Sequence, residues 1–261
     1  MTNWIKNKLC DLTSDNLKLL LDHKIPGIII KNFIPLDTCE EVSKALKNID
    51  FGSYSHLKKI PVYNLGVCHS QYADKDKKFY FNERDNALEV FKDVFKKVDI
   101  DPVDMVINEL SKFTVNAVRI FNEKNYGNYF AGTFRSFKGH GKLHVDYAPI
   151  HIGSAWAVSE VIKQLSWNIY YLTYLEGGGE VIIYDTVHSE NSENYKNEGD
   201  YFYQYDVLNN SNFLKITPEV GDLILFNSQN FHEVKGHSGS DRFSQSSFIG
   251  LKKDGSLNLW S

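Results

Sequence analysis

The chain of 261 residues contains little cysteine, proline or methionine and has no excess of positive charge. Its three cysteines, Cys10, Cys39 and Cys68, are odd in number and far apart, which argues against a disulfide framework or a cysteine metal site. The formal net charge of −4 disfavours a nucleic-acid partner, because phosphate binding normally needs a basic face. No apolar run approaches the length of a membrane span, and the opening MTNWIKNKLCDL is too polar for a signal peptide. We therefore expect a reduced, cytoplasmic protein without a membrane or nucleic-acid partner.

Helical patterns dominate the first 114 residues, which we expect to form a mostly helical support. The amphipathic segments are residues 11–23, 36–49, 86–98 and 104–113. Asp37 and Glu40 have the spacing of an N-terminal capping box, and the β-branched run at 26–33 predicts a strand. Residues 51–86 have weak periodicity, so we expect loops and short strands there that build a substrate wall.

From residue 115 to residue 261 the chain consists of short β-rich runs separated by glycine and proline. These runs are residues 116–121, 132–137, 142–148, 167–175, 179–185, 213–218, 221–227 and 244–251. The pattern is typical of an antiparallel barrel or jelly roll, with one helix expected within 155–165. The polar segment 185–206 is either a solvated loop or a lid over a site. Without repeats or linkers, we predict one domain over 1–261, mainly β with flanking helices.

A histidine and an aspartate are separated by one residue in GKLHVDYAP, residues 141–149. Side chains at positions i and i+2 of a strand point to the same face, so His144 and Asp146 are able to offer an imidazole and a carboxylate to one divalent metal. The tripeptide by itself is common, and a hydrogen-bonded surface pair is the alternative interpretation. Its meaning depends on the rest of the chain.

A third metal ligand and an anion-binding pair occur near the C-terminal end. His232 follows the strand DLILF, Arg242 lies ten positions later, and Ser244 shares a strand face with it. Two histidines and one carboxylate on one side of a metal form the facial triad of non-heme Fe(II) oxygenases. The guanidinium of Arg242, assisted by the Ser244 hydroxyl, suits the distal carboxylate of a dicarboxylic cosubstrate.

The order of these motifs, together with GGGEVIIYD and PGIIIKNFIPLDTCEEVSKAL, resembles the 2-oxoglutarate/Fe(II)-dependent dioxygenase superfamily. The motifs span roughly residues 115–251. The resemblance implies a double-stranded β-helix (a cupin-like jelly roll). It also implies Fe(II) at His144, Asp146 and His232, 2-oxoglutarate at Arg242 and Ser244, and O2 as a further cosubstrate.

The resemblance is also narrower. The segments IIIKNFIPLDT and GDLILFNSQNFHEV resemble those of the freestanding halogenases that act on cyanobacterial indole alkaloids. They also resemble those of small-molecule hydroxylases, including hydroxylases of N-substituted amino acids. The halogenases have glycine where this chain has Asp146, and the missing carboxylate leaves a place for chloride on iron. With Asp146 present, the resemblance implies hydroxylation of an unactivated C–H bond, with succinate and CO2 as co-products.

Five further residues are weaker candidates for the site. Asn168 and Tyr170 lie on one face of an expected strand and are candidates for contacts to 2-oxoglutarate. Tyr147, Trp167 and Arg135 are candidates for substrate binding, although aromatic residues on strands are more often core and Arg135 also suits a salt bridge at the barrel rim.

Three functions remain open at the level of sequence. The first is a hydroxylase of a small molecule, such as an amino acid, an amino-acid derivative or a specialised metabolite. The second is a protein or peptide hydroxylase of the same superfamily. The third is a cupin-like metal-binding protein that is not an oxygenase, which would have no use for a carboxylate-binding arginine ten residues past its last histidine. The sequence does not predict the substrate or the oligomeric state.

Overall fold

The computed structural model describes residues 3–53, 62–137, 139–174, 177–236 and 241–261. Two sheets dominate it, and their strands pair antiparallel except for the parallel pair β15–β4. The strands of the larger sheet run in the order β1-β12-β9-β14-β7-β3-β2, with β15 and β4 attached beside β14, and the smaller sheet has the order β11-β10-β13-β8. The strands of the larger sheet are β1 (Gly27–Ile30), β2 (Gly52–Ser53), β3 (Val62–Leu65), β4 (Val118–Ile120), β7 (Thr133–Phe137), β9 (Lys163–Leu172), β12 (Leu223–Asn227), β14 (Phe243–Leu251) and β15 (Leu257–Trp260).

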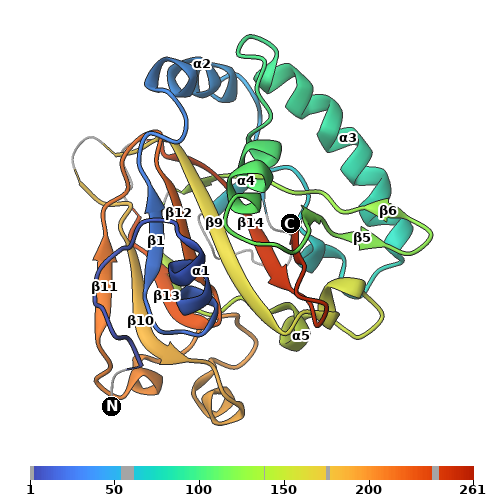
Figure 1. Cartoon of the computed structure of the whole chain (residues 1–261). Helices are drawn as coiled ribbons and strands as arrows, with labels where there is room; N and C mark the ends of the chain where they lie inside the picture. The colour runs from blue at the N-terminus through green and yellow to red at the C-terminus, as the bar shows by residue number, and fades with distance from the viewer. Residues whose placement is uncertain (1–2, 54–61, 138, 175–176, 237–240) are drawn as a thin grey trace.

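The smaller sheet and the helices complete the fold. The smaller sheet contains β8 (Gly141–His144), β10 (Val181–Val187), β11 (Phe213–Ile216) and β13 (Asn230–Val234), while β5 (Asn122–Glu123) and β6 (Gly127–Asn128) form a separate hairpin. The helices are α1 (Ser14–Leu21), α2 (Leu36–Leu46), α3 (Lys77–Phe95), α4 (Pro102–Ser111) and α5 (Ala148–His151), with short 3-10 turns η1 (His69–Tyr72), η2 (Ala157–Glu160), η3 (Glu190–Tyr195) and η4 (Tyr205–Leu208). Figure 1 shows α2 at the top, α3 along the right and α4 near the centre, with β10, β11 and β13 at the left. The predicted jelly roll with flanking helices is confirmed.

The two faces of β9 separate the core from the interior between the sheets. Trp167, Ile169 and Tyr171 are buried in the largest hydrophobic cluster, which also contains apolar residues of α2, α3 and α4. Because side chains alternate along a strand, Asn168 and Tyr170 face the opposite side. The ring of Phe95 on α3 stacks on Phe134 of β7 with centroids 5.7 Å apart, and it fixes the helix on the sheet. The helices thus support the sheet from outside and leave its inner face available for chemistry.

The first 114 residues contribute the strand expected at 26–33 and short strands within 51–86 to the larger sheet. β1 forms one edge of the larger sheet by pairing with β12, and β3 and β2 extend its other side beyond β7. Helix α3 begins at Lys77, inside the stretch expected to be irregular, because Asp76 caps it by accepting a hydrogen bond of 2.9 Å from the Lys78 amide. Residues 54–61 of this stretch lie outside the described residues.

Two local predictions are wrong. The expected capping box does not form, because Pro35 occupies the N-cap of α2 and Asp37 instead accepts a hydrogen bond from the adjacent Thr38 amide. The expected helix over 155–165 is reduced to the 3-10 turn η2, and β9 begins at Lys163. The long pairing of β9 with β14 supplies backbone hydrogen bonds that override the helical periodicity of this segment.

Candidate active site

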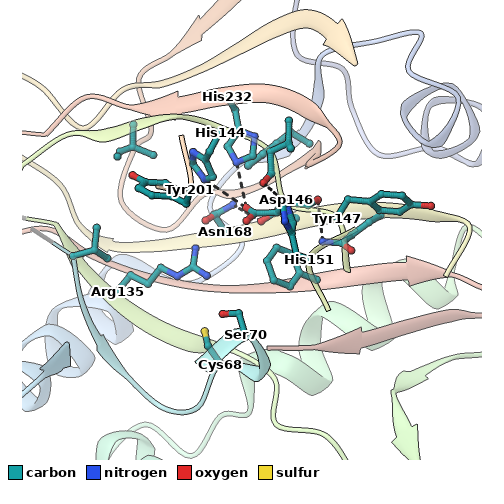
Figure 2. A pocket seen from close by; sticks show the side chains of 18 of the residues that line it. Cys68, Ser70, Arg135, His144, Asp146, Tyr147, His151, Asn168, Tyr201 and His232 are labelled. Atoms are coloured by element: carbon teal, nitrogen blue, oxygen red, sulfur yellow. Dashed lines mark hydrogen bonds and ion pairs between the residues drawn. The ribbon is translucent and has the colours of Figure 1, made fainter. Parts of the chain in front are cut away.

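His144, Asp146 and His232 converge from two neighbouring strands of the smaller sheet. His144 ends β8, His232 lies opposite it on β13, and Asp146 follows two residues beyond the end of β8. One ligand atom from each residue lies within 4.8 Å of the other two. The nearest carboxylate oxygen of Asp146 is 3.6 Å from Nε2 of His144 and 3.4 Å from Nε2 of His232. Figure 2 shows the three side chains pointing toward one another on one wall of a cavity.

Backbone carbonyls orient both imidazoles for a metal. Nδ1 of His144 lies 2.7 Å from the Lys142 carbonyl oxygen, and Nδ1 of His232 lies 2.9 Å from that of Asn230. A carbonyl only accepts hydrogen bonds, so each Nδ1 carries the proton and each Nε2 presents its lone pair toward Asp146. Burial, followed by the neighbouring His144, lowers the pKa of His232 and favours the neutral form that metals require.

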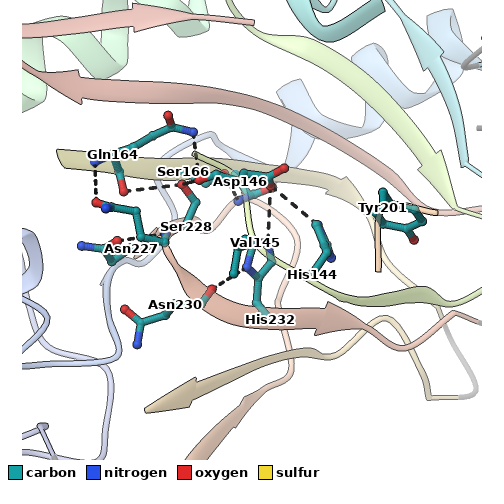
Figure 3. Close-up of polar contacts among 12 residues, drawn as sticks. His144, Val145, Asp146, Gln164, Ser166, Tyr201, Asn227, Ser228, Asn230 and His232 are labelled. Carbon is teal, nitrogen blue, oxygen red and sulfur yellow. Dashed lines mark hydrogen bonds and ion pairs between the residues drawn. The ribbon is translucent and has the colours of Figure 1, made fainter. Parts of the chain in front are cut away.

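The backbone of Asp146, rather than its carboxylate, is anchored by the surrounding polar groups. Its amide donates to the Ser228 carbonyl at 2.8 Å, and its carbonyl accepts from Ser228 Oγ at 2.8 Å and from Gln164 Nε2 at 3.1 Å. Figure 3 shows this anchor on the side away from the imidazoles. Burial raises the pKa of the Asp146 carboxyl, but the positive charge and the hydrogen bonds of the two imidazoles, in their protonated form, outweigh burial and lower that pKa well below its ordinary range. The carboxylate is therefore ionised and turned toward the histidines.

This donor set fits a non-heme iron. Two neutral imidazoles and one carboxylate are the ligands of the facial triad, which leaves the opposite side of the metal open. The side chains of His144 and Asp146 retain 16% and 30% exposure, and both residues line the cavity. Molecules in the cavity would therefore have access to the open side of a metal held by these three residues.

Arg242 is a buried cation that needs an anion. The residue is 2% exposed, and its guanidinium lies between the rings of Phe137 and Tyr170, at 5.0 and 5.1 Å from their centroids. Its Nη1 donates to Ser244 Oγ at 3.4 Å, whereas its Nε has no hydrogen-bond partner among the described residues. Burial lowers its pKa, and no carboxylate among the described residues forms an ion pair with it. A buried unpaired charge is costly, so the site is suited to a ligand carboxylate.

Gly179 makes room for this guanidinium. Its φ of 76° lies in the left-handed region, and a Cβ at this position would lie 3.2 Å from Nε of Arg242 and 3.0 Å from the Tyr174 ring. Gly179 therefore shapes the wall around Arg242.

One cavity of about 320 Å³ connects the triad to Arg242. His144, Asp146, His232, Arg242 and Ser244 all line it. A dicarboxylate that chelates a metal at one end is therefore able to meet the guanidinium with its other end. Such a bridge is what a facial-triad enzyme needs for 2-oxoglutarate.

The weaker candidates divide into three groups. Asn168, Arg135 and Tyr147 line the cavity, and Figure 2 shows all three around it. Tyr170 is fully buried behind the wall, where it stacks on Arg242 and does not line the cavity. Trp167 is also fully buried, in the core on the helix side of β9, which contradicts the expectation that it contacts substrate. The alternation along β9 decides the positions of Asn168, Tyr170 and Trp167.

Several cavity residues were not anticipated from the sequence. Tyr201, from the polar insert, packs its ring 5.4 Å from that of His144, and its hydroxyl accepts from the Lys142 amide at 3.1 Å. Lys196 of the same insert lines the cavity, so part of 185–206 is a wall and not merely a solvated loop, while 185–187 belongs to β10. Cys68 and His69, with Ser70, line the opposite wall. Their spacing gave no signal, because they come from the irregular segment before the barrel.

Cys10 and Cys39 are buried and do not line the cavity. Cys39 is buried, and burial raises the pKa of its thiol to about 12, which makes it unreactive. Within the described residues, His144, Asp146 and His232 form the one cluster of metal-binding side chains. No helix in those same segments of the chain is long and apolar enough to cross a membrane.

Comparisons with known proteins agree with this geometry. The leucinostatins biosynthesis cluster protein S of Purpureocillium lilacinum is 32% identical over 178 residues, which cover 66% of this chain and 72% of that protein. The L-gamma-glutamyl-L-propargylglycine hydroxylase of Streptantibioticus cattleyicolor is 24% identical over 133 residues, covering 51% of this chain and 48% of that protein. The crystal structure of an N-substituted L-amino acid dioxygenase from Burkholderia ambifaria shares the fold, with a TM-score of 0.64 at 13% identity, over 96% of this chain and 92% of that one.

The match to a protein family covers more of this chain than any of these three similarities. Residues 3–261 match the family described as carrier-protein-independent halogenase WelO5. This range includes the triad, Arg242 and the whole of both sheets. The chain belongs to the WelO5 family, a branch of the Fe(II)/2-oxoglutarate-dependent dioxygenases.

Proposed function

We propose that this protein is a hydroxylase that uses Fe(II), 2-oxoglutarate and O2 to oxidise an unactivated C–H bond in a small amino-acid derivative. One observation carries the choice of reaction: Asp146 places a carboxylate within 3.6 Å of both metal-directed imidazole nitrogens. With a metal bound, the Asp146 carboxylate would fill the position that a halide would need. The expected co-products are succinate and CO2, and the match over residues 3–261 supports one catalytic domain.

The chain's own residues have three duties in this reaction. His144, Asp146 and His232 would hold Fe(II), and Arg242 with Ser244 would bind the distal carboxylate of 2-oxoglutarate. When bound, the iron and 2-oxoglutarate supply the oxidising power for C–H cleavage and oxygen transfer. The cavity walls orient the substrate and exclude water, with Tyr201 and Lys196 of the insert covering one side. No protein general base is required.

The substrate class follows from the relatives and the cavity. One similar protein is named for L-gamma-glutamyl-L-propargylglycine, one for N-substituted L-amino acids, and the third for a leucinostatins biosynthesis cluster. The cavity of about 320 Å³ accommodates 2-oxoglutarate and a small molecule. These points favour a small amino-acid derivative over a protein substrate, and the buried Arg242 disfavours a cupin-like protein that is not an oxygenase.

The test combines anaerobic spectroscopy with product analysis. Fe(II) and 2-oxoglutarate together should give a weak visible charge-transfer band, and iron-loaded protein without the band would refute the oxygenase assignment. Succinate formation should then be measured across free amino acids, N-acyl amino acids, alkaloids and nucleosides. A product heavier by one oxygen supports hydroxylation. A chlorinated product would overturn the role given to Asp146.

A further inference from the structure

Arg135 extends into the cavity from β7. It lies directly opposite Ser244 of β14, and side chains paired in this way share one face of a sheet. Alternation along β7 gives the same direction, because Phe134 is buried in the core on the helix side whereas Arg135 and Phe137 line the cavity. Figure 2 shows the guanidinium of Arg135 reaching into the space between the triad and η1. The residue is partly exposed, so a molecule in the cavity has access to it.

The described residues that line the cavity carry a surplus of positive charge. Their cations are Arg135, Lys196 and Arg242, and their one acidic side chain is Asp146. In the proposed holoenzyme the two positive charges of Fe(II) offset the two negative charges of 2-oxoglutarate, and Asp146 offsets Arg242. A surplus therefore remains that the metal and the cosubstrate do not remove. A cavity lined by charge of one sign attracts a ligand of the opposite sign, so this surplus indicates an anionic substrate.

Among these three cations, Arg135 has the position that suits such an anion. The Nζ atom of Lys196 lies 3.6 Å from a carboxylate oxygen of Glu193 and 5.6 Å from the ring centroid of Tyr203, so its charge already has a partner. Arg242 is enclosed by two aromatic rings, and the proposed function assigns it to 2-oxoglutarate. Burial lowers the pKa of Arg242, and the positive charge of Arg135 adds to this effect. A second anion beside Arg135 would offset the repulsion between the two guanidinium groups.

We propose that Arg135 binds a free carboxylate of the substrate, which is therefore an acid, such as an N-acylated amino acid with its α-carboxyl group free. This inference rests on the proposed function and narrows it, because uncharged amides, alkaloids and nucleosides are excluded. A planar guanidinium binds both oxygens of a carboxylate through two parallel hydrogen bonds, which fix the orientation of the ligand as well as its position. With its carboxylate held at β7, the substrate extends across the cavity toward the triad.

The experiment compares N-acetyl-L-leucine with N-acetyl-L-leucinamide, in which an uncharged amide of nearly the same size replaces the carboxylate. Calorimetry on protein loaded with Fe(II) and 2-oxoglutarate in the absence of O2 measures binding without turnover. The wild type should bind the acid at least about tenfold more tightly than the amide, which is the scale of hydrogen bonds to a charged group. Arg135→Gln, which keeps much of the length of the side chain without its charge, should bind both probes alike.

Three further variants separate recognition by Arg135 from folding and from the other cations. Arg135→Lys keeps the charge but loses the bidentate contact, so it should retain part of the preference for the acid. Arg119→Gln makes the matched exchange on β4, outside the cavity, and should behave like the wild type. Lys196→Gln should keep the preference, and the affinity for 2-oxoglutarate should change little in all four variants. If Arg135→Gln does not fold, the comparison of the wild type with Arg135→Lys still tests the inference.

The outcomes distinguish this inference from the function on which it rests. A preference for the acid that persists in Arg135→Gln, or that disappears in Lys196→Gln instead, would overturn the role of Arg135. Weaker 2-oxoglutarate binding in Arg135→Gln with the preference intact would assign this arginine to the cosubstrate and also overturn it. Equal binding of both probes by the wild type, failure to bind the acid, or turnover of an uncharged compound would overturn it while leaving the hydroxylase intact. Absence of both the charge-transfer band and succinate with every substrate would instead refute the proposed function.

Discussion

The rings of His144 and His232 face each other across the β8–β13 pair with their centroids 4.2 Å apart. Cross-strand neighbours in an antiparallel sheet lie at about this separation, so the pairing register itself brings two of the ligands together. A shift of one residue would turn one histidine to the other face of the sheet. The site therefore depends on a register that the whole smaller sheet maintains.

Asp146→Ala should abolish hydroxylation, because the metal loses its one anionic protein ligand. We expect a loss of at least about 100-fold in turnover, the scale on which metal sites respond to disrupted ligation. Product mass spectrometry with added chloride should then reveal whether some halogenated product forms. Unchanged hydroxylation in this variant would remove Asp146 from the metal.

Arg242→Ala should raise the KM for 2-oxoglutarate by about 100-fold or more, because a buried guanidinium–carboxylate contact is lost. The concentration of Fe(II) needed for half-maximal activity should change much less. Arg119→Ala provides the matched control, since this exposed arginine on β4 hydrogen-bonds to Asn258 outside the cavity. Equal effects of Arg242→Ala on iron and on 2-oxoglutarate would contradict the assigned role.

Ser228→Ala should weaken metal binding without removing a ligand. The variant deletes the hydroxyl that donates to the Asp146 carbonyl at 2.8 Å, and the aspartate then loses part of its anchor. We expect the Fe(II) dissociation constant to increase about tenfold, as for other groups that orient metal ligands. Ser211→Ala, which removes a hydroxyl from a turn bond to Asn212, should leave metal binding unchanged. Identical metal affinity in the two variants would argue against the anchor.

His69 should make the protein less stable in mild acid. Its pKa is lowered from 6.5 to about 4 in the folded state, so below pH 6.5 the unfolded chain takes up a proton that the folded protein does not. The free energy of unfolding should therefore fall as the pH drops from 6.5 to 4, by at most about 3 kcal/mol from this residue. His69→Asn should show a shallower pH dependence in urea titrations over the same interval. Parallel curves for the two proteins would place the pKa of His69 near its ordinary value.

The sequence was sufficient to predict the residues that meet at the metal, because their types and order are unusual. His144, Asp146, His232 and Arg242 all lie on one cavity, as their spacing indicated. The residues of the opposite cavity wall were not predictable in the same way. His69 comes from a segment with no regular periodicity, and it reaches the cavity only through tertiary packing.

The errors at secondary-structure level have a common physical origin. The segment 155–165 has a helical pattern, but pairing with β14 converts its end into a strand. Trp167 is an aromatic residue of a kind that often lines pockets. The strand that carries it begins earlier than expected, at Lys163, and the alternation of side chains along this strand directs the indole into the core. Local pattern fixes the period of a segment, whereas contacts distant in sequence decide its phase and its limits.

Because the loop at Asp146 is held through its backbone by Ser228 and Gln164, its carboxylate contacts only the two histidines among the described residues. The side chain at this position is therefore exchangeable without disturbing the loop that presents it. In the proposed function, the choice between hydroxylation and halogenation depends on this one side chain, whereas the backbone anchor of the loop does not depend on it. The same property makes position 146 the most direct entry point for redirecting this enzyme by design.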